Sequence, residues 1–350
     1  MVQNQDYKDS WEDKFEIQVV MEKLLTIIVP VYKVEQYIAK CLDSCILDSE
    51  EQMSNLEVII VNDGTPDKSA EISRSYVVRY PDTFRQIDKE NKGHGSAWNV
   101  GLKEATGKYL RFLDSDDWLC NLDVLMNELK KTDSDLIFTQ YYRHYTETGD
   151  KVLYDTAVPP CNTTVLEPQT WGHHRDSYNA YNFWSLTYKS SILKPLYPLF
   201  AEKVMYDDFI LTSAVLYYGR TYSSFSFPLY NYVIGRTGQS MKATDRKKMA
   251  QSYLSCLSQY AIVWEKTDKT NIPDDYLCTI RSAIKGYANL TFAHLHWLDY
   301  STSKREMRRV WTSYLRENEC HSHMVSRYAK LPFFMFFCLE KIRASLKSVR

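Results

Sequence analysis

The chain has 350 residues and a formal net charge of −1, with 43 Lys and Arg against 44 Asp and Glu. This near-neutral charge gives no support for a nucleic-acid partner, and 44% hydrophobic residues are ample for a core. The length suggests two domains, or one large domain with an extension. Residues 1–20 are polar and do not resemble a signal peptide, and the eight cysteines form no CxxC pair that would indicate a zinc site. No apolar run approaches the roughly 20 residues that span a bilayer, so we expect a cytoplasmic protein.

The first 120 residues alternate between predicted strands and helices. Apolar, β-branched runs predict strands at residues 24–32 and 56–61, and shorter strands are predicted at 84–88 and 109–113. Helical spacing of apolar side chains predicts helices at residues 34–47, 69–80 and 96–106. This β-α-β-α-β-α-β order indicates an α/β fold with a mostly parallel central sheet covered by helices.

Polar residues follow three of these strands at the edge where α/β enzymes bind their ligands. The three strand ends are Val31-Tyr32, Asn62-Asp63-Gly64 and Asp114-Ser115-Asp116-Asp117. Asp114 and Asp116 are two residues apart, so an extended backbone would point both side chains the same way. Two carboxylates beside a diphosphate would form a Mg²⁺ or Mn²⁺ site. The alternative is a simple turn, because Asp and Ser are common turn residues.

Six short segments, in order and spacing, resemble the family 2 inverting glycosyltransferases. They are residues 28–32 (IVPVY), 61–65 (VNDGT), 91–93 (NKG), 99–102 (NVGL), 105–109 (ATGKY) and 112–118 (FLDSDDW). The resemblance implies a GT-A fold, which is a single nucleotide-sugar-binding α/β domain, and a bacterial surface-polysaccharide enzyme of hexosyltransferase type. It also implies a Mg²⁺ or Mn²⁺ cofactor and inversion of the anomeric carbon. Trp98 stands where many members have Arg, so a usual contact to the base or phosphate is absent or altered.

The resemblance assigns roles to residues of the donor side. Those implied for nucleotide binding are Pro30, Val31, Tyr32, Asp63, Lys92, Gly93, Asp114 and Ser115. Asp63 would accept a hydrogen bond from uracil or another base. Asp114 would lie near the ribose and the metal, and Asp116 would bind the metal that bridges the diphosphate. Asp117 receives no role.

The second half of the chain is implied to form the acceptor side. Residues implied for acceptor or diphosphate contacts are Trp184, Asp207, Arg236, Gln239 and Ser240. Asp208 aligns with the catalytic base, which must remove a proton from the acceptor hydroxyl. Two alternatives stay open: Asp208 could cap a helix over residues 209–216, and Arg236 could be a solvated loop cation. His94 could touch the donor or be an ordinary loop histidine.

From about residue 241 the apolar spacing becomes helical. We therefore predict an N-terminal extension over residues 1–23, a GT-A catalytic domain over 24–240 and a helical C-terminal region over 241–350. Residues 331–339 (LPFFMFFCL) are followed by a cluster of Lys and Arg. This pattern suits peripheral contact of residues 331–350 with the inner face of the cell membrane. A helix packed into the core, with a solvated basic face, is the alternative.

We expect an enzyme that moves a sugar from a nucleotide-sugar, by preference a UDP-sugar, to a hydroxyl of a surface-polysaccharide or lipid-linked glycan acceptor. No nucleic acid is expected as a partner. A non-catalytic relative that binds nucleotide-sugars or carbohydrate remains an alternative, although candidates for both the base and the metal ligands are present. A nucleotidyltransferase is a second alternative, but the Gly-rich phosphate loop that it would favour after the first strand is missing.

Overall fold

The computed structural model describes residues 23–155, 161–165, 183–211, 218–236, 245–270, 272–316 and 323–347. Two of the predicted site residues, Gln239 and Ser240, lie outside the described residues. So does the predicted N-terminal extension, apart from its last residue.

Four parallel strands form one half of the sheet, in the spatial order β3-β2-β1-β4. Their bounds are Leu25–Val31 for β1, Leu56–Asn62 for β2, Phe84–Asp88 for β3 and Tyr109–Phe112 for β4. Every residue of β1, β2 and β4 is buried, and most of these residues are apolar, as expected of strands that are covered on both faces. The four strands predicted from the sequence are therefore confirmed.

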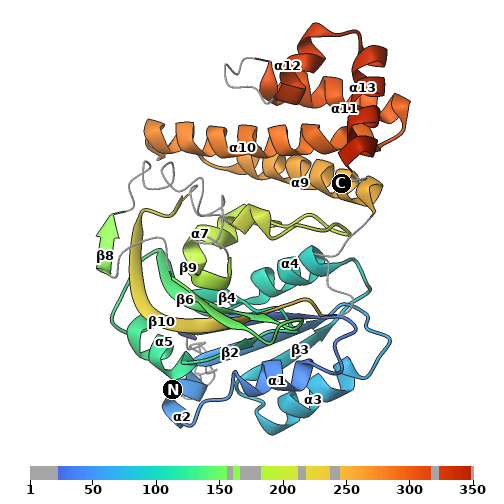
Figure 1. The fold of residues 1–350 in the computed structure, drawn as a ribbon. Coiled ribbons are helices and arrows are strands. Elements are labelled where there is room, and N and C mark those ends of the chain that lie inside the picture. Colours follow the sequence, from blue (N-terminus) through green and yellow to red (C-terminus); the bar gives the residue numbers. More distant parts are fainter. Residues whose placement is uncertain are drawn as a thin grey trace, which may run out of the picture.

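Helices cover both faces of this half of the sheet (Figure 1). They are α1 (Ile38–Asp43), α2 (Glu50–Ser54), α3 (Ser69–Arg79) and α4 (His94–Glu104). In Figure 1, α1 and α3 lie on one side of the sheet and α4 lies on the other. Helix α4 begins two residues before the predicted start, because Gly93 adopts a φ of +90° that turns the chain into the helix at His94.

The other half of the sheet is mixed and was not predicted. Strand β9 (Leu186–Lys189) runs antiparallel to both β4 and β6 (Leu136–Tyr145), and β10 (Thr221–Ile234) runs parallel to β6. The remaining strands and short helices are β5 (Trp118–Leu119), β7 (Lys151–Tyr154), β8 (Cys161–Val165), α5 (Leu122–Leu129) and α7 (Ser190–Leu193). Strands of two to five residues are too short to show a reliable hydrophobic period.

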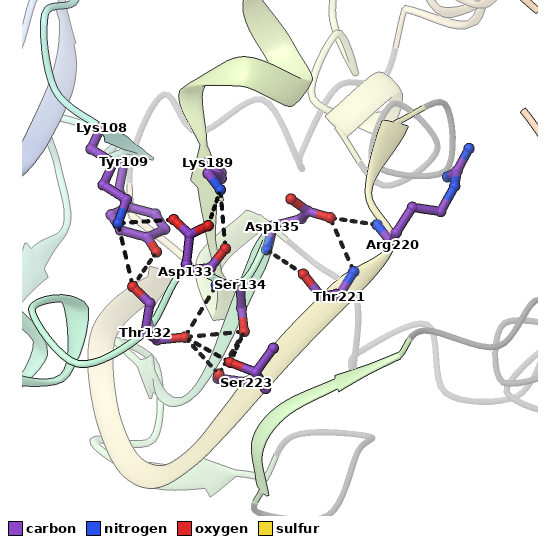
Figure 2. A network of polar contacts seen from close by, with 11 residues as sticks. Lys108, Tyr109, Thr132, Asp133, Ser134, Asp135, Lys189, Arg220, Thr221 and Ser223 are labelled. Carbon is purple, nitrogen blue, oxygen red and sulfur yellow. Dashed lines mark hydrogen bonds and ion pairs between the residues drawn. The ribbon is translucent and has the colours of Figure 1, made fainter. Parts of the chain in front are cut away.

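A polar network ties this half of the sheet together at the edge where β4, β6 and β10 begin (Figure 2). The Asp135 carboxylate accepts hydrogen bonds from the backbone N–H groups of Arg220 (2.7 Å) and Thr221 (3.0 Å). The Asp133 carboxylate instead forms ion pairs with Lys108 (3.0 Å) and Lys189 (2.8 Å). This edge is opposite the carboxyl ends of β1, β2 and β4, so the network stabilises the fold rather than a ligand site.

Replacement of Asp135 should therefore test the network through stability alone. We expect Asp135→Ala to lower the free energy of unfolding by about 1–3 kcal/mol, because two backbone N–H groups lose their acceptor. Asp133→Ala is the matched control, since the Asp133 side chain is 73% exposed and its surface ion pairs contribute only about 0–1 kcal/mol. Urea denaturation measures both, and equal effects of the two substitutions would contradict this account.

The C-terminal region is helical, as the sequence predicts. It contains α9 (Arg246–Lys266), α10 (Asp274–His294), α11 (Tyr300–Val310), α12 (His323–Lys330) and α13 (Phe333–Lys347). Helices α9 and α10 lie side by side next to the sheet domain, and α11–α13 lie beyond α10 on the side away from the sheet (Figure 1). Among the described residues, no helix combines the length and the hydropathy required to cross a membrane.

Helix α9 supports the segment that contains Asp208. The Tyr260 hydroxyl donates to the Phe209 carbonyl (2.8 Å), and the Met205 N–H donates to the Ser252 hydroxyl (3.1 Å). Tyr253 also stacks on Tyr206, with 5.2 Å between ring centroids. The helical region therefore helps to hold the predicted catalytic segment against the sheet domain.

Candidate active site

The ends of β1 and β2 are joined by hydrogen bonds. The Asp63 N–H donates to the Val31 carbonyl (3.0 Å), and the Lys33 N–H donates to the Thr65 hydroxyl (2.8 Å). The side chains of Pro30 and Val31 are buried, whereas Tyr32 is 42% exposed. Of the three residues predicted to line the base pocket, Tyr32 is thus the one whose side chain reaches solvent.

Asp63 organises the loop that follows β3. Its carboxylate is 3% exposed and accepts hydrogen bonds from the backbone N–H groups of Lys92 (2.9 Å) and Gly93 (2.8 Å). The Lys89 ammonium also pairs with it. The structure therefore brings three residues predicted for nucleotide binding together, and their contact with a base stays a prediction.

Three carboxylates gather after β4. Asp114, Asp116 and Asp117 each offer an oxygen, and these oxygens lie within 4.8 Å of one another. Burial and the nearby Asp114 raise the pKa of Asp116, although an ion pair with Arg236 opposes this effect. An all-oxygen donor set with mutually repelling charges fits a hard divalent cation such as Mg²⁺ or Mn²⁺.

Asp117 has a different task from its two neighbours. Its side chain is 1% exposed and accepts hydrogen bonds from the Tyr230 hydroxyl and the Val233 N–H, each at 2.8 Å. Tyr230 in turn accepts a hydrogen bond from the Asp114 N–H (3.1 Å). Asp117 thus anchors β10 beneath the cluster, which leaves Asp114 and Asp116 as the ligand candidates.

His94 bridges two carboxylates that are far apart in the chain, Asp114 and Asp207. Its Nε2 lies 3.0 Å from an Asp114 oxygen, and its Nδ1 lies 3.1 Å from an Asp207 oxygen. Burial alone would lower the pKa of His94, but Asp207 and Asp114 outweigh it and raise that pKa well above its ordinary value. The buried Trp98 packs against the imidazole, with 4.0 Å between ring centroids. The sequence left His94 unassigned, although its place between Gly93 and Gly95 at a helix start was a usable signal.

Asp207 approaches α4 closely because residue 95 has no side chain. A Cβ atom at Gly95 would lie 2.5 Å from an Asp207 carboxylate oxygen and 2.2 Å from the Ala201 carbonyl oxygen. Asn99, one turn further along α4, accepts from the N–H groups of Leu199 (2.9 Å) and Phe200 (3.0 Å). Helix α4 therefore follows directly on the loop of Lys92 and Gly93 and also holds the segment that leads to Asp208.

The close approach at Gly95 can be tested by adding one methyl group. We expect Gly95→Ala to cost about 1–3 kcal/mol of stability through overpacking and to lower activity by displacing Asp207. Gly286→Ala in α10 is the matched control, since nothing lies within 4 Å of its Cβ position and alanine favours a helix. Thermal unfolding measures both variants, and a Gly95→Ala protein as stable as the control would contradict the packing argument.

Asp208 sits beside Asp207 with a strongly altered acidity. Burial, followed by the charge of Asp207, raises the pKa of the Asp208 carboxyl from 3.8 to about 7. The charge on His94 opposes this rise. A carboxylate that titrates near neutral pH is well matched to accepting a proton from a hydroxyl. The predicted helix over residues 209–216, which Asp208 could cap, lies largely outside the described residues.

Trp184, Tyr232 and Arg111 pack together beside the carboxylate cluster. Trp184 stacks on Tyr232 of β10, with 4.0 Å between ring centroids, and its carbonyl accepts a hydrogen bond from Arg111. Its indole N–H is buried and has no hydrogen-bond partner among the described residues. Arg111 is fully buried, and burial lowers its pKa to about 10. The sequence did not identify Arg111, because a cation in a buried strand has no distinctive pattern.

The comparisons with known proteins agree with this geometry. Residues 26–190 match the family model described as glycosyl transferase family 2. EpsJ of Bacillus subtilis (strain 168), named as an uncharacterized glycosyltransferase, is 31% identical over 196 residues, which is 54% of each chain. The minor teichoic acid biosynthesis protein GgaB of the same strain is 32% identical over 154 residues, 43% of this chain and 17% of GgaB. The chain thus spans about half the length of EpsJ and less of GgaB.

A solved structure shares the fold. Residues 1–349 of TarS from S. aureus, crystallised with UDP-GlcNAc, give a TM-score of 0.54 at 18% sequence identity. The match covers 84% of this chain and 92% of that one. This supports the GT-A fold that the family resemblance implies. The matched residues 26–190 contain the polar ends of β1, β2 and β4, so this part of the chain is similar to the glycosyltransferases of family 2.

Proposed function

We propose that the protein is a metal-dependent inverting glycosyltransferase. It moves a sugar from a UDP-sugar to a hydroxyl of a surface-polysaccharide or lipid-linked glycan. The observation that carries this proposal is the His94 bridge, which connects Asp114 of the candidate metal site to Asp207, the neighbour of Asp208. The imidazole contacts a candidate metal ligand on one side and the neighbour of the base candidate on the other. Glycosyl transfer requires both a group that stabilises the leaving diphosphate and a base for the acceptor hydroxyl.

On the donor side, Asp114 and Asp116 would hold a Mg²⁺ or Mn²⁺ ion. When bound, such an ion neutralises the charge that develops on the leaving diphosphate. Arg236 lies beside the candidate metal site, because it forms an ion pair with Asp116. Its guanidinium matches phosphate geometry, so it can turn from the carboxylate to the diphosphate when a cation takes its place.

On the acceptor side, Asp208 would act as the general base. It would accept the proton of the acceptor hydroxyl as that oxygen attacks C1 of the sugar. The diphosphate leaves from the opposite face, so a single displacement inverts the anomeric centre. Trp184 and Tyr232 would offer an apolar, stacked wall for a sugar ring of the acceptor.

The class of donor and acceptor rests on the relatives. TarS, which has the same fold, was crystallised with UDP-GlcNAc, and this supports a UDP-sugar donor here. The name of GgaB, which refers to teichoic acid biosynthesis, supports a cell-surface polymer as the acceptor.

A panel of nucleotide-sugars and nucleoside triphosphates, screened by thermal shift with and without Mn²⁺, tests the proposal. Binding to the folded state raises the melting temperature, so a UDP-sugar should stand out and should require the metal. Metal-dependent release of UDP in the absence of acceptor, followed by chromatography, then tests catalysis. Binding without release would favour the non-catalytic relative, and preference for a nucleoside triphosphate would favour a nucleotidyltransferase.

A further inference from the structure

The charge of the chain is unevenly distributed. Residues 300–350 contain eleven Lys and Arg but four Asp and Glu, a formal net charge of +7, although the whole chain carries −1. These residues include α11, α12 and α13, which lie away from the sheet and from the candidate active site (Figure 1). A cationic region so placed is not explained by glycosyl transfer itself.

A groove opens between these helices. It has a volume of about 370 Å³, and the side chains that line it include Arg308, Trp311, Arg316, Tyr328 and Phe333. Two guanidinium groups beside three aromatic rings form a surface that attracts anions and also contacts apolar groups.

The cations of this groove are available for a ligand. Glu306 of α11 is already bound by Arg305 and Arg309, each at 2.8 Å, and Glu340 of α13 is bound by Arg327. By contrast, the side chains of Arg308 and Arg316 make no ion pair with any described residue. Among the described residues, the acids of α11 and α13 are thus paired with other arginines and not with Arg308 or Arg316.

The aromatic run of α13 has two faces. Phe336 is fully buried and packs against Phe292 and Tyr328, with centroids 6.4 and 5.4 Å apart. Phe334 and Met335 point outward and are 65% and 56% exposed. The two alternatives drawn from the sequence are therefore both partly realised, because one face packs into the core and the other is left in solvent.

We propose that this basic–aromatic region, in which the exposed Phe334 and Met335 directly follow the groove residue Phe333, docks on a bilayer that contains anionic lipids. Phe334 and Met335 would enter the interfacial layer, while Arg308 and Arg316 would contact lipid phosphates. A soluble anionic polymer could satisfy the arginines, but it would leave two large apolar side chains exposed. The combination of charge and exposed apolar surface favours a lipid surface.

Vesicle sedimentation with the full chain tests this proposal. We expect binding to vesicles of phosphatidylcholine and phosphatidylglycerol in equal amounts, and little binding to phosphatidylcholine alone. Arg308→Glu/Arg316→Glu and Phe334→Ser/Met335→Ser should each lower the partition coefficient at least about tenfold. Both pairs lie outside the candidate active site, so metal-dependent UDP release should be unchanged.

Matched controls are available on other surfaces. Val78→Ser/Ile262→Ser removes apolar side chains that are 78% and 41% exposed, and Lys103→Glu/Lys266→Glu repeats the change in charge. Both should leave vesicle binding intact. Equal binding to the two kinds of vesicle, or normal binding by Phe334→Ser/Met335→Ser, would overturn the proposal. If soluble polyphosphate released the bound protein and Phe334→Ser/Met335→Ser did not weaken vesicle binding, the ligand would be a soluble anionic polymer and not a bilayer. These outcomes do not depend on the proposed glycosyl transfer.

Discussion

Asp208→Asn is expected to lower kcat by about 10² to 10⁴, the usual contribution of a general base. The amide has nearly the same shape as the carboxyl group but cannot accept the proton of the acceptor hydroxyl. The metal candidates and the Asp63 loop are untouched, so the dissociation constant for UDP with Mn²⁺ should stay within error. Steady-state transfer and calorimetric titration with UDP measure the two effects separately.

The pH profile gives this prediction a second readout. The pKa of Asp208 is about 7, and the carboxyl must be ionised to act as a base. Log kcat/KM of the wild type should therefore fall with a slope near one as pH drops below about 7. The groups that face Asp208 are Asp207, His94 and Asp114, and their charges set this value together with burial. The residual rate of Asp208→Asn should lack the acidic limb.

Stability should change in the opposite direction to activity. The folded-state pKa of Asp208 lies above its ordinary value of 3.8, so the folded protein holds a proton between about pH 4 and 7 that the unfolded chain has released. This contribution to stability is complete below pH 4 and is lost as the pH rises through 7. Asp208→Asn should therefore melt above the wild type at pH 8, and the difference should vanish near pH 4. Near-normal turnover by Asp208→Asn would refute the base assignment.

Asp116→Asn should abolish the dependence of donor binding on a divalent cation. Metal binding stabilises the charge of the transition state by several kcal/mol. Loss of one of the two candidate carboxylate ligands should weaken this stabilisation, so kcat/KM should fall at least about 10²-fold. Arg236 would also lose its ion-pair partner. The measurement is the shift in melting temperature with UDP as Mn²⁺ is titrated, which should be present in the wild type and absent in the variant.

Two further variants separate metal binding from folding. Asp117→Asn should lower the melting temperature itself, because Asp117 holds Tyr230 and the Val233 N–H of β10. Asp123→Asn, an exposed position at the start of α5, should behave as the wild type. A normal Mn²⁺-dependent shift in Asp116→Asn would show that the metal ligand has been assigned to the wrong carboxylate.

The parallel half of the fold could be predicted because its strands are buried on both faces. The runs at residues 24–32 and 56–61 are apolar except for Thr26 and Glu57, and the observed strands differ from them by one residue at each end of β1 and at one end of β2. Helix α4 was less predictable, because its start depends on the positive φ of Gly93. The mixed half was missed because its pairings join residues far apart in the chain, such as Trp118 with Asn231.

Some parts of the candidate site could also be predicted from the sequence, and others could not. The Asp114 cluster and Asp208 could be identified from short local motifs. The bridge by His94 could not, since it depends on the fold bringing residue 207 to within hydrogen-bond distance of residue 94. The task of Asp117 was equally hidden, because its partners lie 113 and 116 residues away in the chain.

The close fit of α4 against residues 199–207 has a consequence for exchange of segments between relatives. Gly95 makes room for Asp207, and Asn99 binds the backbone at Leu199 and Phe200. Two stretches that are a hundred residues apart therefore form one complementary pair. A chimera that takes residues 94–99 from one homologue and residues 199–208 from another would combine surfaces shaped for different partners. We expect such a chimera to acquire the acceptor preference of a homologue only when both stretches are taken from that homologue.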